Sequence, residues 1–279
     1  MLSRFLSVYR PHRAATLRRL CFVDLRLFNI CKFAVHSRCR TRMDSPRREY
    51  NTEFFNYTSG RFLFGEQEQL DERYKEFCIP ALQDVTVKVT SGTKCVHMSK
   101  LAEGTFNKVF LLTMDSGEQR VARIPHPNAG SKKYTTASEV ATLHYLRTRL
   151  NMPVPEVFAY SCDENNSVGS EYIIMEKVEG EPLHLRWDSM TIEQKRLMVE
   201  QIAQLQSRLL QRPFSCYGNL YFTRDMDSSA CSSQLDDNNS DDDSLYCIGP
   251  SSSGKFWDTG RNTTSSNNGP CIFHVSRCP

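Results

Sequence analysis

The chain has 279 residues, of which 39% are hydrophobic and 10% aromatic, and this composition excludes a wholly disordered protein. Its mild net charge of +3 sits mainly in the first fifty residues, which argues against nucleic-acid binding by the folded part. The eleven cysteines are odd in number, irregularly spaced and without a C-x-x-C pair. They predict reduced thiols and favour neither a disulfide framework nor a zinc site.

Residues 1–43 are rich in arginine and contain a single acid, Asp24. A basic, acid-poor and amphipathic start is typical of a mitochondrial transit peptide, which would place the protein in the mitochondrion and make the import machinery a partner. A disordered basic tail, or upstream sequence wrongly included in the coding region, is the alternative. Charged residues interrupt every long apolar run, so we expect no membrane span.

Residues 44–93 are expected to form an aromatic arm and a helix. Five aromatic side chains should pack on the domain that follows, because so many rings would otherwise be left in water. They are Phe54, Phe55, Tyr57, Phe62 and Phe64. Pro80 is expected to end or interrupt the helix.

Residues 94–178 show the pattern of a small mixed domain. Apolar runs predict strands and a helix in the order 95–102, 108–114, 119–124, a helix within 135–152, 156–161 and 171–177. Gly104 lies in the turn between the first two strands, where glycine tolerates a positive φ without cost. Three strands, a helix and two strands form the order of a protein-kinase small lobe, so the predicted fold class is α+β with a five-stranded antiparallel small lobe.

Arg123 and Glu139 occupy two informative places in this order. In a kinase small lobe, a cation on the third strand holds the nucleotide phosphates and is itself held by a glutamate on the helix. For Arg123 the alternative is a surface guanidinium at a strand edge. For Glu139 the alternative is a capping box, because Thr136-x-x-Glu139 also matches a helix start. The spacing alone leaves these alternatives open.

Three stretches closely resemble fungal members of the aminoglycoside phosphotransferase family, which has a protein-kinase-like fold. They are LAEGTFNKVFLLTMDSGEQRVARIP, TTASEVATLHYLRTRLNMPVPEVFAY and EYIIMEKVEGEPL. The arm sequence EFFNYTSGRFLF, after a basic start, is similar to the mitochondrial branch of that family, altered inheritance of mitochondria protein nine. The resemblance runs continuously over about residues 49–225.

The resemblance implies a nucleotide site and an ATP cofactor. Arg123 would be the phosphate-side cation, a residue that these fungal relatives carry where kinases have lysine, and Glu139 its helix partner. Gly104 would lie in a reduced phosphate-side turn. Residues 175–178 would form the hinge whose backbone faces adenine, so Glu176 and Val178 complete the set of cofactor-binding residues.

Residues 179–224 are expected to begin a helical large lobe, and Thr191-x-x-Gln194 predicts a capped helix. Residues 225–279 are expected to be a low-complexity acidic insertion followed by an aberrant tail. Kinase-like catalysis needs a catalytic-loop aspartate and metal-binding residues, which the family places in an H-x-D loop and a later aspartate motif. None of the seven histidines begins H-x-D, so no catalytic residue or magnesium site is assigned. Asp225-x-Asp227 comes directly after the segment GNLYF and before any catalytic loop, so it is not assigned as the metal-binding motif.

Three interpretations follow, and they leave open whether the protein is an enzyme. The chain is a mitochondrial phosphotransferase-like protein with the nucleotide-side lobe and without phosphoryl transfer. Alternatively, it uses that lobe to bind an unknown protein or small-molecule partner. In the third interpretation it is a C-terminally truncated fragment of an active ATP-dependent phosphotransferase.

Overall fold

The computed structural model describes residues 52–211, 214, 216–227, 233–234, 245–252 and 271–272. The predicted transit peptide, and most of the predicted insertion and tail, lie outside these residues. The chain divides into two compact units. One contains the described residues up to Lys177 and from 214 onward, and the other contains those from Val178 to Gln211.

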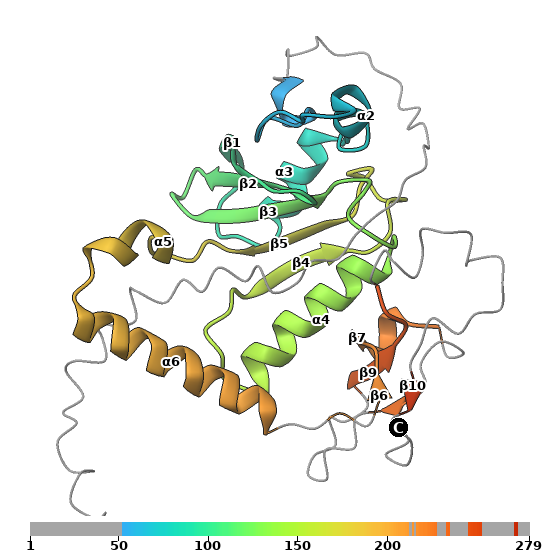
Figure 1. Cartoon of the computed structure of the whole chain (residues 1–279). Coiled ribbons are helices and arrows are strands. Elements are labelled where there is room, and N and C mark those ends of the chain that lie inside the picture. The colour runs from blue at the N-terminus through green and yellow to red at the C-terminus, as the bar shows by residue number, and fades with distance from the viewer. Residues whose placement is uncertain are drawn as a thin grey trace, which may run out of the picture. The chain divides into compact units, whose positions relative to one another are not determined.

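A five-stranded antiparallel sheet forms the centre of the larger unit (Figure 1). The strand order is β1-β2-β3-β5-β4. The strands are β1 (Cys95–Glu103), β2 (Asn107–Met114), β3 (Gln119–Pro125), β4 (Val157–Ser161) and β5 (Tyr172–Glu176). Each lies within two residues of its predicted bounds. With α4 (Tyr134–Thr148) between β3 and β4, this architecture confirms the predicted fold class.

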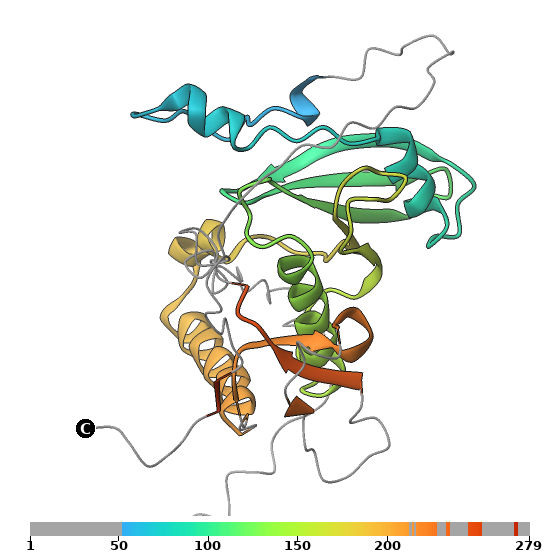
Figure 2. The same cartoon turned by 90° about the vertical axis from the view of Figure 1, so that its right-hand side faces the viewer.

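One face of the sheet packs against the N-terminal part of the unit. In β2 every second side chain is buried, as the two-residue period of a strand requires, which places Phe110, Leu112 and Met114 on the same face. Helix α3 (Ile79–Val87) covers this face through Leu82, which is fully buried (Figure 2). The η2 turn (Thr52–Phe54) adds Phe54, whose ring lies 5.4 Å from that of Phe110.

Helix α4 covers the opposite face (Figure 1). Its apolar residues recur at helical spacing, and Val140, Leu143 and Leu146 pack in one cluster with Ile173 and Met175 of β5. The sheet therefore packs against a helix on each side, and each helix shares a buried apolar cluster with it.

A second, small sheet packs on α4. It has the order β7-β9-β8, with β7 (Asn219–Phe222), β8 (Ser233–Gln234) and β9 (Tyr246–Gly249). Asn219 Nδ2 donates to Ser138 Oγ of α4 at 2.9 Å. Two further strands pair with each other, β6 (Cys216–Tyr217) and β10 (Cys271–Ile272). Segments on either side of the acidic run thus meet in one sheet.

The aromatic arm packs as predicted except at its tip. Phe54 and Phe55 lie against the sheet core, and the Tyr57 and Phe62 rings are 5.4 Å apart. Phe64 is 87% exposed, so its predicted packing is wrong. It directly precedes α2 (Glu66–Asp71), which begins at the left-handed N-cap Gly65 and contains no buried residue, so this part of the arm has no core to join.

Pro80 also differs from its prediction. It stands in the first turn of α3, where its missing N–H has no helical acceptor to lose. The proline therefore begins a helix instead of ending the preceding one.

The smaller unit is helical. It contains α5 (Leu183–Arg186), η3 (Trp187–Ser189) and α6 (Ile192–Leu210). The predicted capping box is confirmed, because the Thr191 hydroxyl accepts from Gln194 N while Gln194 Oε1 accepts from Thr191 N. Within the described parts of the chain, no helix is both long and apolar enough to cross a membrane.

Candidate functional site

Arg123 of β3 and Glu139 of α4 form an ion pair. Alternation along β3 places Arg123 on the same face as Val121, which packs against the cluster that α4 builds. Glu139 lies in the second turn of α4 and meets the arginine there. The two side chains are 28% and 25% exposed, so the pair is half-buried. The structure therefore brings together the two residues that the sequence singled out.

Arg123 keeps its positive charge although its guanidinium is partly removed from water. Burial lowers the pKa of the guanidinium to about 10, which still leaves it protonated at neutral pH. A guanidinium carries five N–H donors, and a single carboxylate cannot accept hydrogen bonds from all of them. The pair can therefore hold a second, anionic group while keeping Glu139 in place.

The start of α4 is fixed by a residue from another part of the chain. Its N-cap, Lys133, has a positive φ of 68° and makes no side-chain cap. Instead, Glu171 Oε1 accepts from Lys133 N at 2.9 Å, and Glu171 Oε2 accepts from the Thr136 hydroxyl. Burial raises the pKa of Glu171, and the hydrogen bond from Thr136 opposes this effect.

These contacts correct the capping-box alternative for Glu139. Thr136 lies inside α4 and donates to Glu171, so the Thr136-x-x-Glu139 match does not mark the helix start. Glu139 is free of a capping role and pairs with Arg123. Sequence reasoning missed Glu171 because its partners stand 35 and 38 residues away, beyond any local pattern.

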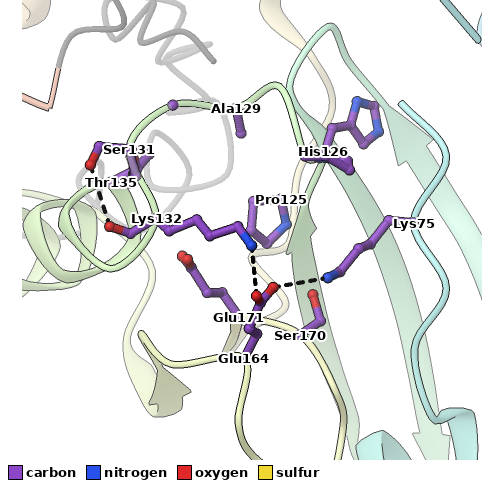
Figure 3. A pocket seen from close by; sticks show the side chains of 12 residues that line it. Lys75, Pro125, His126, Ala129, Ser131, Lys132, Thr135, Glu164, Ser170 and Glu171 are labelled. Carbon is purple, nitrogen blue, oxygen red and sulfur yellow. Dashed lines mark hydrogen bonds and ion pairs between the residues drawn. The ribbon is translucent and has the colours of Figure 1, made fainter. Parts of the chain in front are cut away.

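A small cavity of about 30 Å³ lies beside the loop between β3 and α4 (Figure 3). Lys132 and Lys75 approach the same carboxylate, with Nζ atoms 2.6 and 3.4 Å from the two oxygens of Glu164. The buried Ser170 hydroxyl borders the cavity and has no hydrogen-bond partner among the described residues. The space suffices for a water molecule. These ion pairs tie the loop before α4 to the neighbouring segments of the lobe.

Gly104 differs from its prediction. It does not have a positive φ, so its conformation does not require glycine. A Cβ atom added at this position would meet no atom within 4 Å. The turn is closed by a hydrogen bond from Gly104 N to Asn107 O at 2.9 Å. The space beside Gly104 is therefore open, and an alanine side chain would fit there as well.

Glu176 ends β5, and its backbone N–H donates to Glu156 O at 2.8 Å. Its carboxylate accepts from Glu156 N at 3.1 Å and from Arg147 Nη1 at 3.3 Å. The Glu176 side chain thus contacts Glu156, the residue before β4, and Arg147 of α4. Val178 begins the smaller unit.

A larger cavity of about 760 Å³ lies beside the end of β4. Its polar groups are joined to one another, since Tyr160 Oη donates to Asp225 Oδ2 at 2.7 Å and Arg224 Nη2 donates to Tyr160 Oη at 3.0 Å. Burial raises the pKa of the Cys162 thiol to about 12, so this cavity offers no thiolate at neutral pH.

Asp225 and Asp227 do not converge on one site. Asp225 accepts from Tyr160, whereas Asp227 lies 3.5 Å from Lys133 Nζ. Among the described residues, no group of three or more histidines, cysteines and acids is arranged to hold a metal ion.

A model of the phosphotransferase enzyme family matches residues 97–241, which include most of β1, all of β2 to β5, α4 and the Arg123–Glu139 pair. The chain belongs to this family. The match covers most of the five-stranded sheet and both members of the ion pair. Phosphotransferase-family membership confirms the resemblance noted in the sequence.

Fungal proteins are among the relatives of this phosphotransferase-family chain. A subtelomeric hrmA-associated cluster protein of Aspergillus fumigatus is 46% identical over 177 residues, covering 63% of this chain and 33% of the relative. Altered inheritance of mitochondria protein 9 of Yarrowia lipolytica is 28% identical over 251 residues, covering 81% and 42%. The protein of the same name from Komagataella phaffii is 27% identical over 237 residues, covering 67% and 38%.

The chain spans between a third and about two-fifths of the length of these relatives. No solved structure matches the chain.

Proposed function

We propose that this chain binds ATP through its kinase-like lobe, with Arg123 as the phosphate-side cation and Glu139 as the residue that orients it. The observation that carries the proposal is the half-buried Arg123–Glu139 ion pair at the place where phosphotransferases of this fold hold the nucleotide phosphates. Removing two charges from water is costly, so such a pair is best explained by an anionic ligand. The open space beside Gly104 would receive the phosphates, and the backbone at the end of β5 would face the adenine.

The proposed activity of the 279-residue chain is nucleotide binding without phosphoryl transfer, because its sequence contains no H-x-D loop. A longer protein that supplies this loop and a metal-binding aspartate would be an ATP-dependent phosphotransferase. Use of the same lobe to bind a protein partner is the competing function, and it predicts no affinity for nucleotide.

Arg123→Ala tests the site. We expect the Kd for a fluorescent ATP analogue to rise about tenfold or more, since a charge-assisted hydrogen bond to phosphate is lost. Arg123→Lys should recover part of the affinity, because it keeps the charge and loses the planar fork.

Arg120→Ala is the matched control. It removes the same charge from the same strand, but Arg120 pairs with Glu118 and lies over the Phe158 ring. If Arg123→Ala binds the analogue as tightly as the wild type and Arg120→Ala do, the nucleotide site is wrong.

We also propose a mitochondrial location. The arginine-rich residues 1–43 support it, as do the names of two relatives, both called mitochondrial. Removing residues 1–43 from a fluorescent fusion of the chain should abolish mitochondrial fluorescence in a fungal cell. Unchanged mitochondrial fluorescence after the deletion, or cytosolic fluorescence of the intact chain, would contradict the transit-peptide assignment.

A further inference from the structure

Glu103 is an acid buried at the end of β1, immediately before Gly104. Its side chain is 3% exposed. Glu103 Oε2 accepts from Thr58 N at 2.6 Å, from Thr58 Oγ1 at 3.0 Å and from Lys100 Nζ at 2.7 Å. Thr58 belongs to the aromatic arm, 45 residues earlier in the chain. One carboxylate therefore fastens the arm to the base of the Gly104 turn.

Lys108 closes the same turn from β2. It is opposite Glu103 in the β1–β2 register, and its Nζ lies 3.1 Å from Glu103 Oε1. The side chain is fully buried and also donates to the carbonyl oxygen of Arg73 at 2.8 Å. Burial lowers the pKa of Lys108 to about 8, although the Glu103 charge opposes this effect. A lysine buried at such cost must be held by its partners.

Two further contacts hold the turn itself. His126 N donates to Phe106 O at 2.8 Å, and His126 Nδ1 lies 3.2 Å from Thr105 O. The other ring nitrogen, Nε2, lies 3.4 Å from Glu103 Oε1. On the arm side, Lys100 Nζ donates to Asn56 O at 2.9 Å. The turn is thereby bound to the arm, to the segment before α3 and to the loop after β3.

We propose that the first half of the aromatic arm, residues 53–58, is a positioning element of the nucleotide site and that Glu103 is the positioning residue through which it acts. The Gly104 turn has open space on one side, so it would lose conformational freedom when it closes on the phosphates, and this loss would weaken binding. The Glu103 contacts remove part of that freedom before the ligand arrives, which improves affinity without touching the nucleotide. This inference rests on the proposed function, because it requires the turn to face nucleotide.

The test compares nucleotide affinity with the rigidity of the turn. We expect Glu103→Gln to raise the Kd for a fluorescent ATP analogue about tenfold and to accelerate amide hydrogen exchange at Gly104 and His126, whose N–H groups bond within the turn region. Thr58→Val removes one donor and keeps the other contacts of Glu103, so it should raise Kd about threefold. Thr58→Val decides the question if Glu103→Gln does not fold.

Glu118→Gln is a matched control, because Glu118 lies in the turn between β2 and β3, at the opposite end of β2 from the Gly104 turn. Glu118 Oε2 accepts from Ser91 N and Ser91 Oγ, both at 2.8 Å, as Glu103 accepts from Thr58. It ties an N-terminal segment to the sheet far along β2 from the Gly104 turn. We expect Glu118→Gln to leave both the Kd and the exchange at Gly104 unchanged.

The outcomes separate this inference from the proposed function. If Arg123→Ala weakens binding while Glu103→Gln and Thr58→Val bind like the wild type, the arm does not position the site and the nucleotide function stands. If none of the three variants changes the Kd, both proposals are overturned. If Glu103→Gln and Glu118→Gln weaken binding equally, the effect is general loosening of the sheet and the positioning role is refuted.

Discussion

Phe110→Ala is expected to lower the free energy of unfolding of this chain by about 4 kcal/mol, through lost burial and the cavity that remains. Phe110 is fully buried at the centre of β2, and its ring lies 5.4 Å from both Phe54 and Phe77. These neighbours come from the arm and from the segment before α3. The cavity would therefore loosen the contact between the N-terminal region and the sheet, and urea unfolding would measure the loss.

Leu101→Ala serves as the control, since Leu101 is 53% exposed on the neighbouring strand β1. Its cost should stay below about 0.5 kcal/mol. Equal losses for the two variants would contradict the core described here. A loss under about 1 kcal/mol for Phe110→Ala would do the same.

Glu103→Gln is expected to destabilise the chain by about 3 kcal/mol at neutral pH, because it leaves the buried Lys108 ammonium without its opposing charge. The cost should shrink in acid. Burial alone would raise the pKa of Glu103, but His126, Lys100, Thr58 and Lys108 outweigh it and hold that pKa far below its ordinary value of 4.5.

The sign of the pH dependence follows from this depressed pKa. Below about pH 4.5 the unfolded chain takes up a proton at Glu103 that the folded chain refuses. Wild-type stability therefore falls with acidification by up to about 1.4 kcal/mol per pH unit from this residue, and the Glu103→Gln variant has no such slope from this position. Urea unfolding at pH 7, 4 and 3 should show the two proteins converging. Parallel loss of stability in both would show that Glu103 is not charged in the native state.

Much of the small lobe is visible in the sequence because the signals are local. The two-residue alternation in Asn107–Met114 marks a strand with one buried face, and Asp115-Ser116-Gly117 marks the turn after it, where Gly117 has a φ of 83°. The Thr191–Gln194 capping box spans three residues, and it forms as predicted. The Arg123–Glu139 pair could be predicted from the sequence because the order of the strands and the helix resembles that of a known fold.

Other features depend on partners that only the folded chain brings together. Lysine is ordinarily a surface residue, yet the Lys108 side chain is completely buried. Glu103 and the Arg73 carbonyl oxygen are the partners that hold it there. Thr136 matches a local capping pattern, but Glu171, 35 residues away, takes its hydroxyl.

The sequence alone therefore determines which segments of the small lobe become strands and helices, because side-chain periodicity and turn chemistry act over a few residues. The tertiary structure decides which charges are buried, how α4 begins and what holds the Gly104 turn. A buried charge is stable only beside its partners, and here those partners lie tens of residues apart in the chain.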